Sequence, residues 1–399
     1  MGNKILGDAV LEKLTIDQVE GNQEIVEFAL RDFIVGVISG SKKYPKRHYS
    51  NQFDAMLALV LMGSADDLDD VDWDVLTHPG SIIWPVLIAK YFEDGGDFEC
   101  LIRSASVGYR TGRTIAKLFG PAHRGIWHLT ETSGAVAATS ALSHYLKLTN
   151  EQTLAAMKMT LTNMSGSPQA GFERIGATQS NRAAAATLAM TSVASALMGA
   201  PIINNIWEGP RGIVALFNLS PTILEQVTEN NLNAVILPGT QTLHLRAFFA
   251  TGFVASAIAG VLDLLKKSGE PEFITVELPQ NLAGLLDGAL GNFWWDPQLI
   301  MKSLVHGRDP FNLSPTPQPA ANILITFTDI AVGAAKVSIE SGVETFTRTI
   351  TTPPFKLSGL LEGEIEMIHR KWEIMSGVKD IQTQDLANLI ERLKILLRS

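Results

Sequence analysis

Apolar side chains recur every three or four residues through the first part of the chain, the spacing of helices with one buried face. In residues 24–39 this spacing is seen in Ile25, Phe28, Ala29, Phe33 and Val37. Apolar or amphipathic stretches predict further helices over 53–62, 82–91, 101–118, about 135–146 and 153–164. We therefore predict a helical N-terminal part joined by short connections.

The pattern changes at about Lys266, where polar and apolar residues begin to alternate as in strands. Strands are predicted over 273–278, 322–328, 335–340 and 344–351, and helices over 297–305 and 362–375. The last two strands flank Ser341-Gly342 and form a hairpin. The predicted fold class is mainly α, with an all-helical domain of residues 1–267 plus 357–399 and a smaller α+β domain of residues 268–356.

Two uncharged stretches, Ala183–Trp207 and Ala247–Leu262, are long enough to raise the question of membrane spans. Both are rich in Ala, Ser, Thr and Gly, and Pro201 interrupts the first. We therefore predict buried helices, over 183–203 and 247–262, that pack closely in the domain core or at a subunit interface, and no membrane partner.

Composition excludes several function classes. The 399 residues are 46% hydrophobic, which is ample for a large core. A net charge of -9 without a Lys/Arg cluster argues against a nucleic-acid partner. Cys100 is the only cysteine, which excludes a disulfide framework and an iron–sulfur cluster held by several thiolates. The first twenty residues lack a signal-peptide pattern, so a cytoplasmic location is expected.

The stretch Ala65–Ser81, between two predicted helices, is the main candidate for chemistry. It places Asp66, Asp67, Asp69, Asp70, Asp72 and Asp74 ahead of His78. Carboxylates this close raise one another's pKa, which is useful in a catalytic site, although a solvated acidic loop is an equal alternative. The stretch does not match an EF-hand loop, because Val75 and Ser81 stand where Gly and Glu are needed.

Two more features of the sequence have competing interpretations. Residues 66–70 also fit the aspartate-rich pattern that holds magnesium and a diphosphate, but no second metal motif follows. His128 precedes a predicted helix whose N-cap we expect at Thr130, Thr132 or Ser133. Backbone N–H groups there favour a substrate carboxylate, whereas a lone loop histidine is more often structural.

The ordered set of segments resembles the MmgE/PrpD family, which includes 2-methylcitrate dehydratase, cis-aconitate decarboxylase and iminodisuccinate epimerase. The segments are Asp32 to Gly40, the Asp-rich stretch closed by His78-Pro79, Arg124-Gly-Ile-Trp-His128-Leu-Thr130, Ser165-Gly166, Asn181-Arg182, Trp207-Glu208-Gly209, Pro238 with His244, and Lys371-Trp372. The resemblance implies a helical domain built from both ends of the chain, a small α+β lid, a cleft between them and usually a homodimer. It also implies acid–base chemistry on small polycarboxylates without a cofactor or metal.

The family pattern assigns roles to particular residues of this chain. Catalytic roles are predicted for His78, His128, Asp67 and Asp70, although the Asp spacing leaves their individual roles open. Substrate-binding roles are predicted for Asp69 and Thr130, and, from their positive charge and not from the family pattern, for Arg182, His244, Arg246 and Arg124. Each of the cations has an equally weighted alternative as a surface or capping residue.

The chain departs from the family where two active-site lysines are expected. Gly176 or Ala177 occupies one position, with Arg174 as the nearest cation, and Val235 occupies the other. We therefore expect a lyase or isomerase acting on a small molecule less anionic than methylcitrate. Dehydration is the typical family reaction, and an isomerase or cyclase of a biosynthetic pathway, or a non-catalytic binding or dimerisation relative, are the alternatives.

Overall fold

The computed structural model describes residues 6–16, 22–44, 49, 51–173, 178–217, 219, 232–286, 293–307, 309–311, 313 and 322–398. The chain divides into two compact units. The larger comprises Met1–Leu243 and Met375–Ser399, and the smaller comprises His244–Ile374. The domain boundaries and the cleft expected from the sequence stay predictions.

The larger unit is built from helices. They are α1 (Leu6–Ile16), α2 (Gln23–Gly40), α3 (Gln52–Gly63), α4 (Gly80–Asp94), α5 (Phe98–Arg124), α6 (Leu129–Tyr145), α7 (Asn150–Asn163), α8 (Gln169–Phe172), α9 (Thr178–Leu197), α10 (Ile213–Leu216), α12 (Leu232–Val235), the 3-10 helix η4 (Ile381–Thr383) and α17 (Leu386–Arg398). The short strand β1 (Val71–Asp72) interrupts the connection between α3 and α4. These bounds confirm the helices predicted over 24–39, 53–62, 82–91, 101–118 and 153–164.

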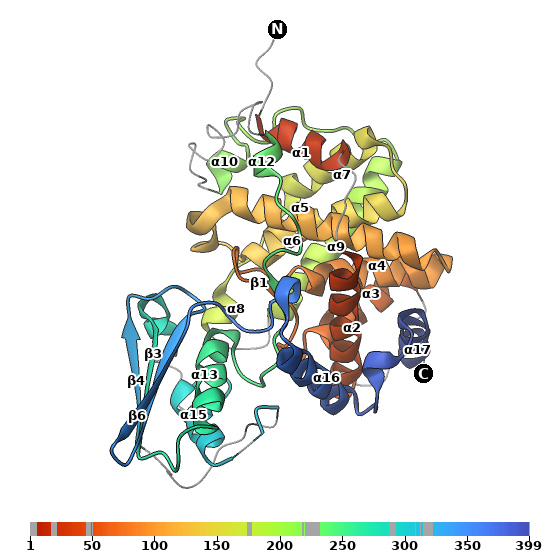
Figure 1. Ribbon diagram of the computed structural model, residues 1–399. Helices are drawn as coiled ribbons and strands as arrows, with labels where there is room; N and C mark the ends of the chain where they lie inside the picture. The colour runs from red at the N-terminus through yellow and green to blue at the C-terminus, as the bar shows by residue number, and fades with distance from the viewer. Residues whose placement is uncertain are drawn as a thin grey trace. The chain divides into compact units, whose positions relative to one another are not determined.

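Helix α6 lies at the centre of this unit, beside α5 (Figure 1). It is buried over nearly its whole length and also packs against α4, α7 and α9. Small residues allow the close approach: a Cβ added to Gly112 of α5 would lie 2.9 Å from Ala137 Cβ, and one added to Gly108 would lie 3.0 Å from Ala141 Cβ. The Ala, Ser and Thr content of α6 thus reflects tight helix packing.

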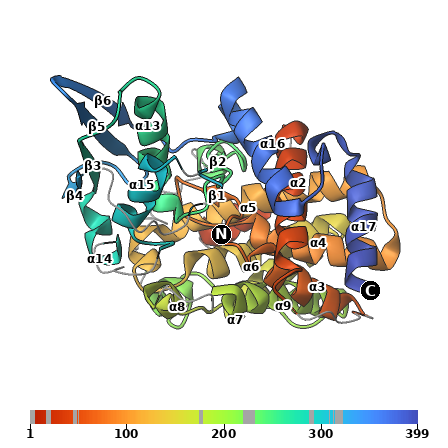
Figure 2. The ribbon, with the colours of Figure 1, turned by 90° about the horizontal axis from the view of Figure 1, so that it is seen from below.

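The C-terminal helix α17 packs against α2, joining segments far apart in the sequence (Figure 2). Arg31 Nη1 of α2 donates to the carbonyl oxygens of Ile381, at 2.6 Å, and Gln384, at 2.8 Å. These bonds attach the segment that precedes α17 to α2.

The smaller unit is an α+β assembly. Its elements are η1 (Gly252–Val254), α13 (Ala255–Leu265), β3 (Phe273–Pro279), η2 (Gln280–Leu282), α14 (Ala283–Leu286), α15 (Pro297–Val305), β4 (Asn322–Thr328), β5 (Ala335–Ser341), β6 (Glu344–Ile350), η3 (Leu357–Gly359) and most of α16 (Glu362–Ser376); the two-residue strand β2 (Leu243–His244) lies at its boundary. The predicted strands, the hairpin and the helices over 297–305 and 362–375 are confirmed.

The four-stranded sheet has the order β4-β3-β5-β6. Strands β3 and β4 are parallel, whereas β5 is antiparallel to both β3 and β6. Ile274, Val276 and Leu278 of β3 are fully buried and alternate with less buried residues, as the period-two pattern requires. Helix α13 packs on β5 and β6, and α15 packs on β4.

Three local predictions were wrong. Helix α6 begins at Leu129 and not near 135, because Thr132 and Ser133 direct their hydroxyls to the Leu129 carbonyl within the helix. Helix α9 ends at Leu197 and not at 203, since Gly199 adopts φ 73° and Pro201 lacks the N–H that a helix needs. The stretch 247–262 is helical only from η1 onward.

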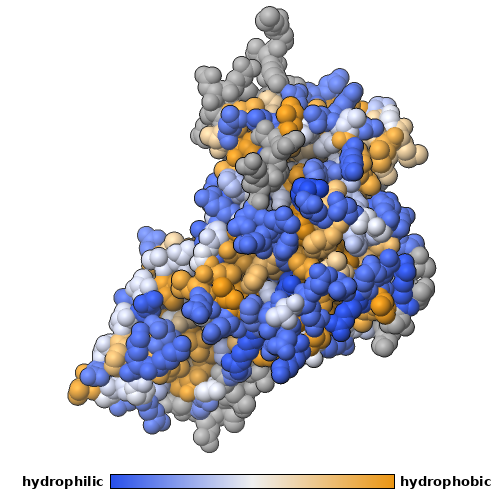
Figure 3. All heavy atoms as spheres, turned by 45° about the vertical axis from the view of Figure 1, so that its right-hand side comes forward, coloured by the Kyte–Doolittle hydropathy of each residue, from blue (hydrophilic) through white to orange (hydrophobic). Residues whose placement is uncertain are grey.

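Mainly α architecture with a smaller α+β region is therefore the fold class, as the sequence predicted. In the part of the chain described here, no helix has both the length and the apolar character to cross a bilayer. The face of the molecule in Figure 3 is mostly hydrophilic with hydrophobic side chains interspersed.

Candidate active site

The acidic stretch is folded against the core of the larger unit. Asp69, Asp70 and Asp72 are buried, with at most 5% of each residue exposed, so this part of the stretch is not a solvated loop. Asp66 forms an ion pair with Lys43 at 2.6 Å, and Asp74 pairs with Arg113 and Lys117. Separate protein partners therefore hold these carboxylates apart, which disfavours a shared magnesium–diphosphate site.

Asp72 has a structural environment. Its carboxylate accepts hydrogen bonds from the Thr242 hydroxyl at 2.6 Å and the Asp74 backbone N–H at 3.0 Å. Arg113 Nε lies 3.5 Å from the other oxygen, yet burial raises the pKa of Asp72. These contacts fix the connection between α3 and α4, at whose end His78 stands.

His78 is held from three sides. Its Nδ1 lies 2.7 Å from the main-chain oxygen of Asp70 and 3.5 Å from Asp69 Oδ2, and its backbone N–H donates to Thr130 Oγ1 at 3.2 Å. A carbonyl oxygen can only accept, so in the neutral imidazole Nδ1 carries the proton and Nε2 is the basic nitrogen. The side chain is 22% exposed, which allows a small molecule to reach it.

Behind His78, Asp70 is tied into a buried network. Tyr109 of α5 donates its hydroxyl proton to Asp70 Oδ2 at 2.6 Å, and Trp84 Nε1 donates to the same hydroxyl oxygen at 2.9 Å. The first residue of α4, Gly80, donates its N–H to Asp70 Oδ1 at 3.1 Å. Burial raises the pKa of Asp70 to about 7, against the lowering effect of the Tyr109 bond. Asp70 is thus placed to position His78 through its carbonyl.

Asp69 and Arg182 form a buried ion pair beside His78. Arg182 Nη1 of α9 lies 3.2 Å from Asp69 Oδ2, and the two side chains are only 3% and 2% exposed. Arg182 Nε is buried and has no hydrogen-bond partner among the described residues. The pair brings one positive and one negative charge next to the imidazole.

His128 lies at the N-terminus of α6, as predicted, but it is itself the N-cap residue, so the N-cap predicted at Thr130, Thr132 or Ser133 was wrong. Burial, followed by the nearby charges of Arg182 and His78, lowers the pKa of His128 to about 3. The ring is therefore neutral at physiological pH. Its electrostatic coupling to both residues places His128 in the same neighbourhood as His78.

One buried acid beside His128, Glu131, was not predicted as a site residue from the sequence. Glu131 lies three residues after His128, with Oε2 at 4.0 Å from His128 Nδ1 and a side chain only 5% exposed. Burial raises the pKa of Glu131 to about 8. An acid in the first turn of a helix is common, so its sequence position gave no signal of burial.

The remaining predicted residues have other surroundings. Asp67 is half-buried with φ 50°, and its N–H donates to the Ser64 carbonyl at 3.1 Å. Arg124 ends α5, is half-buried, and has a pKa lowered by burial. His244 and Arg246 belong to the smaller unit, where His244 Nδ1 contacts the Pro354 carbonyl at 3.0 Å. A common site of these two with His78 stays a prediction.

Of the two positions where a lysine was expected, only the one at Val235 lies among the described residues. Arg174, Gly176 and Ala177 lie outside the described residues. Val235, in α12, packs against an apolar cluster that contains Ile115, Phe119 and Trp207. An apolar side chain suits that environment better than a lysine ammonium would.

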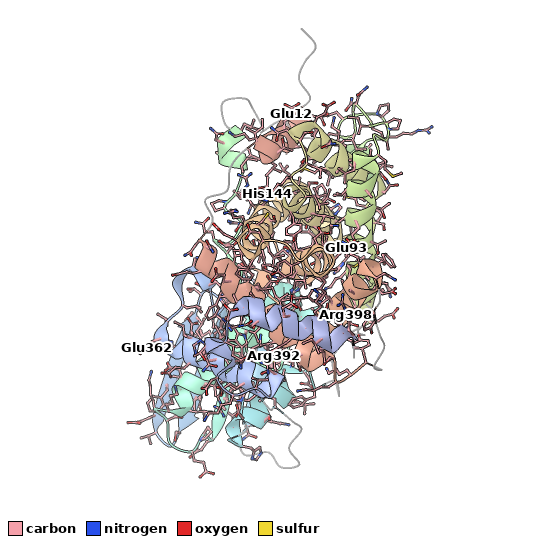
Figure 4. All side chains as sticks on the ribbon, turned by 90° about the vertical axis from the view of Figure 1, so that its right-hand side faces the viewer. Glu12, Glu93, His144, Glu362, Arg392 and Arg398 are labelled. Atoms are coloured by element: carbon pink, nitrogen blue, oxygen red, sulfur yellow. The ribbon has the colours of Figure 1, made fainter. Side chains whose placement is uncertain are left out.

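Two other described histidines of the larger unit, His123 and His144, have structural surroundings. His144, in the last turn of α6, pairs through Nδ1 with the Ser104 hydroxyl of α5 at 2.8 Å (Figure 4). His123 pairs through Nε2 with Thr132 at 3.0 Å and contacts aromatic rings of Phe119, Trp127 and Phe217. Within the described ranges, no group of three or more His, Cys, Asp or Glu residues is arranged to hold a metal ion.

The fold and the site define a mainly α protein in which two histidines, a buried ion pair and buried acids lie close together, in the connection between α3 and α4, at the start of α6 and on α9. The family model of the MmgE/PrpD N-terminal domain matches residues 34–225, which include all of these groups. Nearly half of the chain thus matches the MmgE/PrpD family, as its sequence resemblance implied. This match supports an enzyme with dehydratase- or lyase-type activity. No curated protein sequence matches the chain.

Proposed function

We propose that the protein is a cofactor-independent acid–base lyase or isomerase that acts on a small carboxylate or a less anionic intermediate of specialised metabolism. Dehydration is the reaction most typical of its family. The observation that carries the proposal is the anchoring of His78 Nδ1 by the Asp70 carbonyl beside the Asp69–Arg182 pair, because it leaves Nε2 as the basic nitrogen.

Elimination of water from a hydroxy acid needs a base, an acid and positive charge for the developing enolate. His78 Nε2 is the proposed base that removes the carbon-bound proton. His128 is the proposed acid for the leaving hydroxyl, while Arg182 and the N-terminus of α6 supply positive potential. An isomerase would use the same base to remove a proton and return it to another carbon.

The catalytic set predicted from the sequence takes distinct proposed roles. Asp69 orients His78 and balances the charge of Arg182, and Asp70 positions His78 from behind. Thr130 fixes the His78 backbone. Roles for Asp67, Arg124, His244 and Arg246 in holding the substrate remain part of the proposal.

A weakly anionic substrate is favoured by the scarcity of cations. Arg182 already faces one carboxylate, and Val235 sits in an apolar setting where a lysine was expected. A charged hydrogen bond is worth ~1.5 to 3 kcal/mol, so two missing lysines would lower the preference for a tricarboxylate roughly a hundredfold or more. We therefore propose poor turnover of 2-methylcitrate and cis-aconitate. We also propose a cytoplasmic homodimer that needs no metal or nucleotide and no nucleic-acid partner.

The test is proton exchange in D2O followed by NMR on a panel of hydroxy acids. We expect exchange of the carbon-bound proton next to the carboxylate of a monocarboxylic substrate, and loss of that exchange in His78→Ala. Rapid conversion of 2-methylcitrate would contradict the substrate class. A protein that is inert toward the whole panel but binds one member would favour the non-catalytic alternative.

A further inference from the structure

Two buried polar atoms face each other at the start of α6 without any hydrogen-bond partner in the described part of the chain. They are His128 Nδ1 and Glu131 Oε2, which are 4.0 Å apart. Leaving a buried polar atom unpaired costs about 1–3 kcal/mol, so two of them side by side require an explanation.

The surrounding backbone holds the pair in place. His128 donates its backbone N–H to the Gly166 carbonyl at 3.0 Å, which closes the loop after α7 over the first turn of α6. Gly166 adopts φ 134°, and a Cβ there would collide with Glu131 Oε2. A residue other than glycine would therefore displace the carboxyl group from its position near the imidazole.

A single proton shared between these two atoms satisfies both of them. Burial favours the neutral form of each group, so at neutral pH the proton resides on Glu131, and His128 is a neutral imidazole. A protonated carboxyl donates and the imidazole Nδ1 accepts, which leaves the other ring proton on Nε2. The 4.0 Å separation is longer than a hydrogen bond, and such contacts commonly shorten when substrate binds.

We propose that Glu131 is a positioning residue that sets the tautomer of His128 and resupplies its proton during the reaction. The inference rests on the proposed acid–base function. When the substrate C–O bond breaks, His128 Nε2–H gives its proton to the leaving hydroxyl, which departs as water. Glu131 then transfers its proton to Nδ1, and it becomes a carboxylate.

The proton balance closes within the site and the solvent. His78 Nε2 gains the proton from the substrate carbon and releases it to solvent after product leaves. His128 Nε2 takes up one proton from solvent and Nδ1 returns its proton to Glu131, which restores the starting form of both groups. Because Glu131 supplies a proton to Nδ1 when Nε2 loses one, His128 serves as an acid despite its strongly lowered pKa.

Several titratable groups surround this pair and belong in any pH experiment. His78, which Asp69 contacts, acts on His128 from the connection before α4, and Arg182 acts on it from α9. On α5, His123 contacts Thr132, next to Glu131; on α7, Lys158 is engaged with Asp8 at 2.7 Å. The decisive readout must therefore report on His128 itself.

The test is NMR of protein labelled with nitrogen-15 in its histidine rings, with His128→Asn used to assign the signals. In the wild type we expect the Nε2–H tautomer below pH 8 and a change toward Nδ1–H with a midpoint at about 8. Glu131→Gln should abolish that change between about pH 6 and about pH 10, since an amide does not titrate. Glu151→Gln, at the exposed start of α7, is the matched control and should behave like the wild type.

A wild-type His128 that keeps one tautomer over this range would overturn the inference, as would the same midpoint in Glu131→Gln. The measurement needs no substrate. The role of Glu131 can therefore be refuted while the proposed acid–base function stands, and the proposed function can be refuted while the role of Glu131 stands. With a substrate from the D2O panel, Glu131→Gln should lower kcat about a hundredfold with little change in KM. An unchanged kcat would contradict the relay.

Discussion

At the scale of single residues, the position of His78 depends on a chain of buried hydrogen bonds that starts on α5. Tyr109 connects Trp84 to Asp70, whose carbonyl faces the imidazole. Tyr109→Phe would leave both an indole N–H and a carboxylate oxygen without their partner.

We expect Tyr109→Phe to lower the free energy of unfolding by ~1 to 3 kcal/mol. Tyr44→Phe is the control, because the Tyr44 hydroxyl donates only to Gln179 in a partly exposed setting and should cost less. Urea titrations of both variants check this. Equal effects of the two substitutions would show that the buried network contributes little.

Glu131 also makes a prediction about stability and pH. Its pKa in the folded protein, about 8, lies above the ordinary value of 4.5, so folding favours the protonated acid. Its contribution to stability is present below about pH 4.5 and is lost as the pH rises through about 8. In this window Glu131 lowers the unfolding free energy by up to ~1.4 kcal/mol per pH unit.

Glu131→Gln should remove the pH dependence of the unfolding free energy that comes from Glu131. The difference in unfolding free energy between Glu131→Gln and wild type should therefore grow in favour of the variant from about pH 5 to about pH 8. Denaturation at several pH values measures it. A difference that does not vary with pH would mean that Glu131 titrates normally.

At the scale of elements, the contact between α5 and α6 sets the distance between the helices that hold the site. Gly112 approaches Ala137 so closely that a larger side chain has no room. We expect Gly112→Leu to lower the unfolding free energy by ~1 to 3 kcal/mol through overpacking.

Gly363→Ala provides the opposite control for this helix contact. No atom lies within 4 Å of a Cβ added at Gly363 in α16, and a helical alanine is favoured over glycine by ~0.5 to 1 kcal/mol. Chemical denaturation should thus show Gly112→Leu below the wild type and Gly363→Ala at or above it. A stable Gly112→Leu variant would refute the close packing.

Periodicity predicted most elements, including the bounds of α15 and β4, because strong side-chain patterns and clear breaks mark them. It failed where side chains act locally. The hydroxyls of Thr132 and Ser133 look like caps in the sequence but bond within the helix. Gly199 and Pro201 end α9 although the apolar run continues beyond them.

Much of the candidate site was also predictable, since His78, His128, Asp69 and Arg182 stand in recognisable segments. Their partners were not predictable in the same way. Asp69 and Arg182 are separated by more than a hundred residues, and the packing of α9 against α3, α4 and α6 brings them together. Glu131 has a raised pKa because it is buried, next to Gly166, and the sequence pattern does not reveal that burial.

At the scale of the whole molecule, the homodimer implied by the family resemblance is a prediction for solution. The end of α9 and the segment after it expose Leu197, Met198 and Ile203, with Met198 86% exposed. Light scattering of the purified protein should give about twice the chain mass of 43.2 kDa. A monomer at all concentrations tested would contradict the prediction.

The central claim is that His78 acts as the base of a metal-independent reaction on a weakly anionic carboxylate. The most direct measurement is hydrogen–deuterium exchange at the substrate carbon, followed by NMR on the monocarboxylate panel with EDTA-treated protein. The account predicts exchange with the wild type, none above background with His78→Ala, and thermal unfolding profiles that are nearly the same for both proteins. Undiminished exchange with His78→Ala, or exchange that requires added magnesium, would contradict it.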